Sequence, residues 1–304
     1  MSKALSGKRK DTIHLSVGDR IFMIVNRIVL VFAGVITLFP FLYVLAISLL
    51  SAEEYNQRGI VIPSHPTLDN YRLMITSSTK IQDAYVVTIF MTVVGTFIAL
   101  MITAMLAYGL SKKNLPGHKF INTMLVITMF FGGGMIPTYM VIKALGLMNS
   151  LWALILPASL SVWNTFVMRT FFREIPDALE ESARLDGADD FVIAFRIVFP
   201  LSKASFATIA LFYAVGYWNE WYAALLYLND TKLYPLQMAL RDIIAQNAAA
   251  LDVSKMAAKG LTQSVPSVTT KMTAIMVSTL PILCVYPFVQ KYFIKGVLVG
   301  SLKG

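Results

Sequence analysis

The chain alternates between long apolar runs and shorter polar segments, and six of the runs are long enough to cross a bilayer. A transmembrane helix needs about 20 mostly apolar residues. The six predicted spans are Ile28–Leu50, Ala84–Leu110, Phe120–Leu145, Ser150–Thr170, Ser205–Leu228 and Met272–Phe293. Because lipid offers the backbone no hydrogen-bond partner, each span is expected to be helical. The pattern predicts an all-α polytopic membrane protein whose six-helix domain occupies residues 28–293.

Proline and glycine interrupt several of these spans. The interruptions are Pro40 in the first span, Gly132-Gly133-Gly134 and Pro137 in the third, Pro157 in the fourth, and Pro281 and Pro287 in the sixth. Broken helices are tolerated in a membrane where they pack on protein or line a cavity. A bundle that opens and closes would use such breaks. The alternative at any one proline is an ordinary kink filled by neighbouring side chains.

Composition and charge support the membrane assignment and orient the chain. The 304 residues are 57% hydrophobic and only 14% charged, whereas soluble domains have about 25% charged residues. Most of the 26 lysines and arginines fall on the side of the N-terminus when the spans are threaded through a bilayer. This bias predicts that both termini are cytoplasmic, including an N-terminal segment, 1–27, and a tail, 294–304. It also accounts for the net charge of +9 without invoking nucleic acid.

Two outer loops, 51–83 and 229–271, are long. The second contains a predicted amphipathic segment, Leu236–Ala250. Loops of this length are often functional. Either the second loop is a lid that packs on its own helices or it contacts an external protein.

The sequence contains no recognisable energy source or hydrolytic centre of its own. Its one cysteine, Cys284, excludes an internal disulfide, and its three histidines share no ligand spacing. It has neither a phosphate-binding glycine loop nor a zinc-protease or serine-hydrolase motif. We therefore expect no catalytic residue, metal or cofactor in this chain.

One cytoplasmic loop, 171–203, is too polar to span a membrane and too regular to be a linker. Pro176 fits the first turn of a helix that extends to Asp186, and Gly187 suits a left-handed stop. Acidic side chains lie near the positive end of the helix dipole: Asp177, Glu180 and Glu181. A second helix is predicted from Asp189 or Asp190 to Phe199, after which Pro200 restarts the chain toward the fifth span.

The first of these helices has the features of a docking element. Leu179 and Ala183 lie one turn apart on one face, with Ser182 beside them, and this small face would fit a groove. A helix joined by short connections to two spans could act as a lever. The alternative is an amphipathic helix resting on lipid, but anionic lipid would repel its acidic residues.

These residues also carry a family resemblance. The run Glu180–Ala188, followed by Phe195–Leu201, resembles the Glu-Ala-Ala loop of ATP-binding-cassette importer permeases. Leu145–Pro157, Trp218-Asn219-Glu220 and the tail from Gln290 resemble the shorter, six-helix half of carbohydrate-uptake permeases of the maltose-transporter type. Phe131–Tyr139 is similar to a branch that handles complex oligosaccharides. Ser182 departs from the pattern, which usually has alanine there.

The resemblance implies a type I importer fold and a set of site residues. The residues expected to couple to a partner ATPase are Leu179, Glu180, Glu181, Ser182, Ala183, Asp186 and Gly187. The tail residues expected to reach the interface between two ATPases are Leu302, Lys303 and Gly304. Glu181 would make the polar contact, Ala183 the close approach and Gly187 the turn.

The resemblance also implies partners. These are a second permease subunit that forms a heterodimer, two ATP-binding-cassette ATPase subunits and an extracellular or periplasmic sugar-binding protein, which the 229–271 loop would contact. ATP and Mg²⁺ would bind to the ATPases, and the complex would lie in the bacterial plasma (inner) membrane. Hydrolysis by the partner would drive alternating access in this chain.

A solute path is predicted near Glu220, the one acidic residue well inside a span. On a continuous helix it would lie roughly 12 Å from the outer end, where a charge normally faces a cavity or a partner. Tyr213, Tyr217 and Tyr227 would share its face. The candidate path residues are Tyr213, Tyr217, Trp218, Asn219, Glu220 and Trp221. Alternatively, the tryptophans belong to an interfacial aromatic belt and Glu220 pairs with the partner permease.

Other function classes remain open on the sequence alone. A secondary transporter would need coupling-ion sites and usually an internal repeat, and we find neither. A membrane enzyme would need polar residues that converge near one face. An importer permease for a solute other than sugar is a further alternative.

Overall fold

The computed structural model describes residues 16–51, 53–55, 62–77, 79–112, 114–245 and 268–301, with backbone alone for 77, 79 and 285–301. Every regular element in these ranges is a helix, which confirms the all-α prediction. The predicted tail contacts Leu302, Lys303 and Gly304 lie outside the described residues, as do residues 246–267 of the second outer loop.

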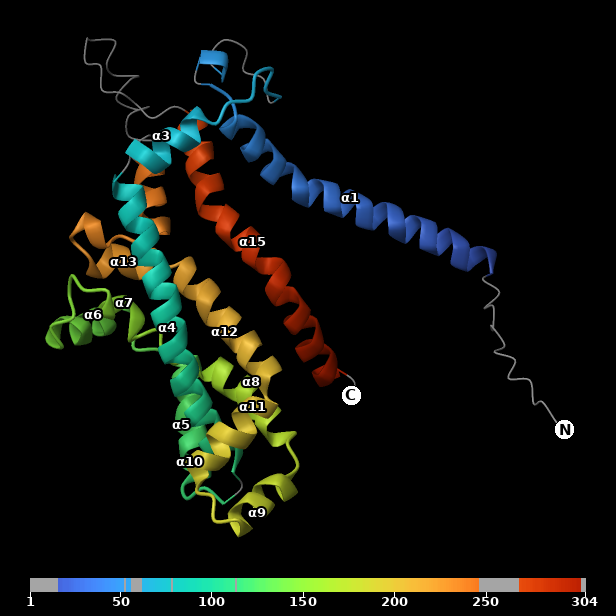
Figure 1. Cartoon of the computed structure of the whole chain (residues 1–304), viewed down its shortest axis with the longest axis vertical. Helices are drawn as coiled ribbons and strands as arrows, with labels where there is room; N and C mark the ends of the chain where they lie inside the picture. Colours follow the sequence, from blue (N-terminus) through green and yellow to red (C-terminus); the bar gives the residue numbers. More distant parts are fainter. Residues whose placement is uncertain are drawn as a thin grey trace.

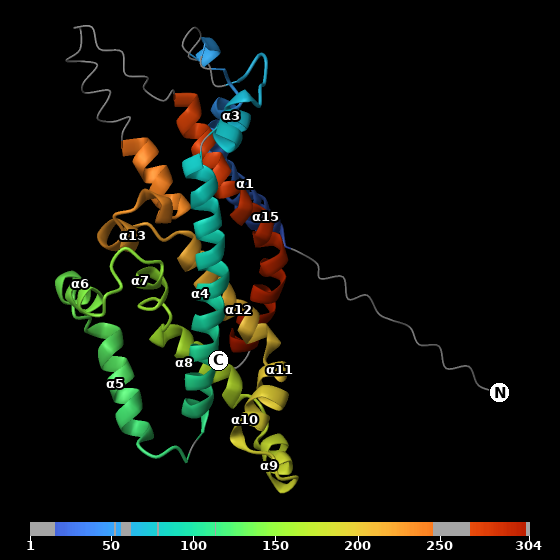
Figure 2. The ribbon, with the colours of Figure 1, turned by 60° about the vertical axis from the view of Figure 1, so that its left-hand side comes forward.

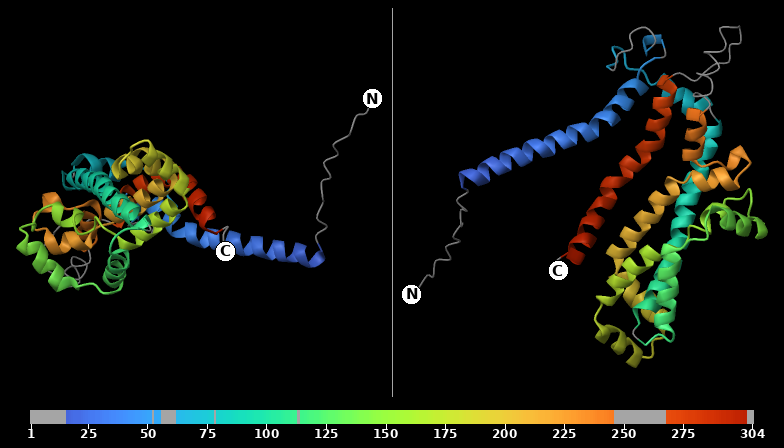
Figure 3. Two further views of the ribbon diagram at one scale, coloured as in Figure 1. Left: turned by 90° about the horizontal axis from the view of Figure 1, so that it is seen from below. Right: turned by 180° about the vertical axis from the view of Figure 1, so that it is seen from behind.

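The first helix, α1 (Val17–Ser48), confirms the first predicted span and begins about three turns before it. Ser16 caps it, accepting a hydrogen bond from the Asp19 N–H at 3.2 Å while the Asp19 carboxylate accepts from the Ser16 N–H. Pro40 lies inside the helix without ending it. The helix diverges from the other spans and meets them at its last turns (Figures 1 and 3).

Three polar contacts fix that end of α1. The Ser48 hydroxyl pairs with the Tyr71 hydroxyl of α3 (Asp69–Ser77) at 2.6 Å. Thr273 of α15 (Val268–Ser301) donates to the Ser48 carbonyl at 3.2 Å, and the Asn70 amide donates to the Leu50 carbonyl at 2.8 Å. α3 therefore forms part of the predicted outer loop and ties α1 to α15.

The central helix is α4 (Thr79–Ser111), which confirms the second predicted span. It packs along α12 (Lys203–Trp218) and α8 (Val162–Arg173), as Figure 2 shows. Small residues on α4 permit this close approach, since Ala99, Ala104 and Ala107 are all fully buried.

The third predicted span is not a single helix. It consists of α5 (His118–Phe130) and α6 (Met135–Ala144), and the chain bends by 113° between them. The break falls at Gly132-Gly133-Gly134, and Gly134 adopts a φ of +84°, which side-chain-bearing residues rarely adopt. The glycine run was predicted to interrupt this span, but the size of the bend was not.

The fourth and fifth predicted spans also need correction. The fourth comprises a short helix, α7 (Trp152–Ile155), a turn that contains Pro157, and α8. The fifth comprises α12 and α13 (Tyr222–Tyr227), separated by residues 219–221. In the fourth span the break falls at Pro157, which was predicted to interrupt it. In the fifth span a continuous apolar run predicted a continuous helix, because hydropathy does not detect a turn whose polar backbone groups are satisfied by packing.

The sixth predicted span lies within α15. Among the described residues, α1 and residues 80–111 are long and apolar enough to cross a membrane alone, and the number rises to four if each of two bent helix pairs is one span. The count of six spans therefore stays a prediction.

An irregular set of hydrogen bonds, here called the Asn149 clamp, joins the segment before α7 to the segment after α13. Asn149, which has a positive φ of 56°, donates its N–H to the Tyr227 carbonyl at 2.8 Å. Its side-chain oxygen accepts from the N–H groups of Asn229 and Asp230 at 3.0 and 2.9 Å. Beyond this clamp, residues 236–245 are helical and bury Leu236 and Met238, which confirms the described part of the predicted amphipathic segment.

Candidate functional site

The predicted lever helix is present as α9 (Asp177–Leu185), at the end of the molecule opposite α3 (Figure 1). Pro176 immediately precedes it, one residue outside the predicted start. Asp177 and Glu180 lie in the first turn, where the helix dipole favours negative charge.

α9 ends at a two-bond stop that depends on Gly187. The Gly187 N–H donates to the Arg184 carbonyl at 3.0 Å, and the Ala188 N–H donates to the Ala183 carbonyl at 2.9 Å. This pair of bonds requires a left-handed residue after the cap, and Gly187 has a φ of +84°. The predicted role of Gly187 as the stop is confirmed.

The second helix of the loop is less regular than predicted. Asp189 caps α10 (Asp190–Ile193), accepting from the Val192 N–H at 2.8 Å. A π-helical turn, η1 (Ala194–Val198), follows, in which the Phe199 N–H donates to the Ala194 carbonyl. The chain continues through α11 (Phe199–Leu201) and turns by 85° into α12. Pro200 therefore lies within a helical turn rather than after one.

The predicted coupling residues divide between two faces of α9. Leu179, Glu181, Ser182, Asp186 and Gly187 are exposed, whereas Glu180 and Ala183 are partly buried. Leu185, which sequence reasoning missed, is 89% exposed. Glu181 and Ser182 lie four and three residues before Leu185, and the three side chains form the outer face of α9. The sequence did offer a signal for Leu185: it is an apolar residue four positions after Glu181, and therefore on the same face of the predicted helix.

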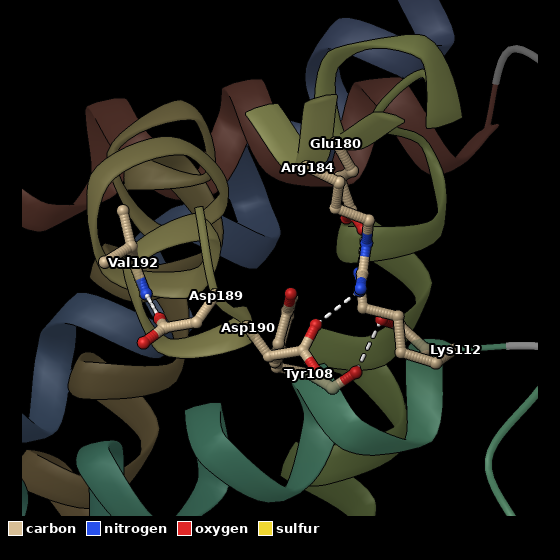
Figure 4. A network of polar contacts seen from close by, with 8 residues as sticks. Tyr108, Lys112, Glu180, Arg184, Asp189, Asp190 and Val192 are labelled. Carbon is tan, nitrogen blue, oxygen red and sulfur yellow. Dashed lines mark hydrogen bonds and ion pairs between the residues drawn. The ribbon is translucent and has the colours of Figure 1, made fainter. Parts of the chain in front are cut away.

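Two ion pairs hold the inner side of α9 (Figure 4). Glu180 pairs with Lys112, the residue that follows α4, and both side chains are mostly shielded from solvent. The Lys112 ammonium also lies 4.1 Å from the centre of the Tyr108 ring. Arg184 pairs with Asp190 of α10, where both side chains are exposed. The two pairs lie along a pocket of about 860 Å³ between α9 and the ends of α4 and α8.

An aromatic cluster lies next to these two ion pairs and shares Tyr108 with them. Phe199 is its centre, with ring centroids 5.8 Å from Phe172, 4.9 Å from Phe195 and 5.1 Å from Phe206. Tyr108 of α4 meets Phe199 edge-on at 6.5 Å. This aromatic cluster therefore joins α4, α8, η1, α11 and α12 at the end of the bundle near α9.

Two of the predicted path residues are packed inside this chain. Tyr213 is 6% exposed, and its hydroxyl pairs with Thr103 at 2.6 Å and accepts from the Ser161 N–H at 3.0 Å. Tyr217 is 3% exposed and donates to the Ile155 carbonyl at 2.9 Å. Both tyrosines hold α12 against neighbouring elements.

The other path residues lie at the end of α12 and in the break after it. Trp218 donates to the Ser278 carbonyl of α15 at 3.3 Å. Asn219 and Trp221 are exposed, and a Glu220 oxygen accepts from the Ala223 N–H at 2.8 Å, at the start of α13. Because α12 ends at Trp218, the predicted single face through Tyr227 and the helical depth of Glu220 are wrong. A role for the six residues in a solute path stays a prediction.

Comparisons with known proteins place these features in context. Residues 84–299 match the family model described as binding-protein-dependent transport system inner membrane component. The chain is 44% identical to the polygalacturonan/rhamnogalacturonan transport system permease protein YtcP of Bacillus subtilis, over 94% of this chain and 99% of that protein. It is 42% identical to Protein LplC of the same organism, over 96% of this chain and 98% of that protein.

A solved structure is also similar to this one. It is a chain from the crystal structure of a bacterial ABC transporter involved in the import of the acidic polysaccharide alginate. The TM-score is 0.81 at 31% sequence identity, and the similarity covers 92% of this chain and 99% of that chain.

Proposed function

The chain belongs to the family of binding-protein-dependent transport system inner membrane components, and we propose that it is the shorter permease half of an ATP-driven oligosaccharide importer. The observation that carries this proposal is α9 with its Gly187 stop, which lies inside the region that the family model matches. The chain is a multi-pass membrane permease of a bacterial inner membrane.

The connections of α9 support an alternating-access mechanism. Short segments join α9 to α8 on one side and, through α10 and α11, to α12 on the other. A partner ATPase that gripped the outer face of α9 would displace both helices together. ATP and Mg²⁺ would bind to that partner, and a second permease half would complete the path.

The solute class that best fits the proposal is acidic oligosaccharides. YtcP is named for polygalacturonan, a polymer of a sugar acid, and the similar solved importer is described with the acidic polysaccharide alginate. An external sugar-binding protein would deliver the solute to the outer end, near the Asn149 clamp.

Purification of the tagged chain from its native membrane tests the assembly. We expect an ATP-binding subunit and a second permease to co-purify, and the complex to take up labelled oligogalacturonate faster than a neutral maltodextrin of equal length. Glu181→Lys should abolish uptake without preventing membrane insertion. A complex that lacked an ATPase would overturn the importer proposal, and equal uptake of both sugars would overturn the acidic class alone.

A further inference from the structure

We propose that Glu180 and Lys112 form a strut that makes α4 move together with α9, so that Glu180 acts inside the permease rather than as a contact to the ATPase. The proposal rests on the proposed importer function. It assigns different tasks to two adjacent carboxylates, Glu180 on the inner side of α9 and Glu181 on its outer face.

The strut is a shielded contact. The Glu180 side chain is 18% exposed and that of Lys112 is 25% exposed, whereas the Arg184 and Asp190 side chains are 51% and 61% exposed. An ion pair that is partly removed from water is less screened by solvent and salt than one on the surface. The Tyr108 ring beneath the Lys112 ammonium adds a cation–π contact that restricts the lysine further.

The position of the strut in the fold gives it a task. The polypeptide connects α9 directly to α8 and α12, so displacement of α9 reaches those helices through the backbone. α4 has no such connection, although it is the helix along which α8 and α12 pack (Figure 2). Lys112 directly follows α4, so its bond to Glu180 joins the base of that helix to α9.

A second contact at the same level supports movement as one body. Tyr108, one turn before Lys112, packs against Phe199 of the aromatic cluster. The ionic contact and the aromatic contact together attach α4 at two points to the loop that contains α9. A carboxylate engaged in this way is turned from the outer face, where the exposed Glu181 remains available to a partner.

Charge reversal in the complete complex, reconstituted in vesicles, tests the strut. We expect Lys112→Glu and Glu180→Lys each to lower sugar uptake at least about fivefold, the low end of coupling factors between linked sites, while ATP hydrolysis continues. The double reversal should restore most of the uptake, and Lys112→Arg should retain it. Single variants with normal uptake, or a double variant no better than the singles, would overturn the strut.

Matched variants separate the strut from general damage to the loop. Glu180→Gln removes the shielded pair, and Arg184→Gln removes the exposed pair on the same helix. We expect uptake to fall only in the former, and an equal fall in both would contradict a specific role for Glu180. If the unaltered complex neither hydrolysed ATP nor took up sugar, the proposed function would fail instead.

A covalent replacement provides an independent test. In a Cys284→Ala background, Lys112→Cys with Glu180→Cys should lose uptake, and a short reagent that joins the two thiols should restore it. Continued loss of uptake after joining would show that α4 and α9 must separate during transport, which would overturn the proposal.

Discussion

At the residue scale, Gly187 is a position where backbone conformation, and not space, limits substitution. Its φ is +84°, and a Cβ atom built there would have no neighbour within 4 Å in this chain. Gly187→Ala should therefore cost about 1–2 kcal/mol of backbone strain, and Gly187→Asn less, because asparagine tolerates this region. We expect uptake to decrease in the order glycine, asparagine, alanine, proline, measured at matched membrane levels. Full activity of Gly187→Pro would exclude the stop from the mechanism.

Gly95 of α4 is limited by space instead. A Cβ atom there would lie 2.7 Å from the Tyr217 ring, so Gly95→Ala should destabilise the α4–α12 contact by about 1–3 kcal/mol. Thermal unfolding of the purified complex would show this as a lower midpoint. Adding Tyr217→Leu, which removes the ring, should recover part of the loss. A midpoint unchanged by Gly95→Ala would mean that α12 shifts away without penalty.

These two glycines differ in how far the sequence reveals them. Gly187 was predicted because its signal is local: it follows an acidic helix that starts at a proline, and it precedes a new helix start. Gly95 was not predicted, because its constraint is the Tyr217 ring from a distant part of the chain. The same limit applies to Glu180, whose pattern showed a charge near the helix dipole but not the lysine at the end of α4.

At the element scale, α1, α4, α9 and α15 were predicted because each is one continuous pattern, although α1 begins about three turns before its predicted start. The break inside the fifth span was missed for a physical reason. Asn219 donates its N–H to the Val215 carbonyl, and Glu220 bonds the start of α13, so the break satisfies its own polar groups. The hydropathy of the run 205–228 gives no indication of those bonds.

Two substitutions distinguish whether Glu220 acts at this break as a helix cap or through its charge. Glu220→Ala should remove the bond to the Ala223 N–H and cost about 1 kcal/mol, as the loss of a helix cap does. Glu220→Gln keeps an acceptor oxygen but removes the charge. We expect both variants to assemble with the ATPase, and only a charge-dependent solute path would make the glutamine variant slower in uptake. Normal uptake by Glu220→Gln would leave Glu220 as a cap.

At the scale of the whole molecule, the predicted orientation places α9 inside the cell and α3 outside. In a Cys284→Ala background, Leu68→Cys should react with a membrane-impermeant thiol reagent in intact cells, because Leu68 is 67% exposed next to α3. Asn114→Cys, near the pocket beside α9, should react only after permeabilisation. Reporter tags at either terminus should behave like residue 114. The opposite labelling pattern would invert the topology.

The sequence could predict the class of the whole molecule but not its surfaces toward partners. Its apolar runs and family pattern indicated a helical permease, which the family match confirmed. The side chains of α1 are almost all exposed up to its last turns. The sequence of such an apolar helix is the same whether lipid or another protein surrounds it. Partner surfaces depend on residues of another chain, so one sequence cannot specify them.

The π-helical turn at Ala194–Val198 sets a limit on how this loop can change in length. A π-turn is equivalent to one residue inserted into an α-helix, and one residue corresponds to about 100° of helical rotation. Because the wide turn already accommodates that extra residue, deleting Ile197 would let the turn close as ordinary α-helix and would leave α9 in nearly its present direction relative to α11. A residue removed from α10 instead, where the helix is regular, would rotate the outer face of α9 by about 100°, even with every side chain on it intact. A single-codon deletion is therefore tolerated inside this turn and misaligns the lever when it falls beside it, although the family pattern stays recognisable in both cases.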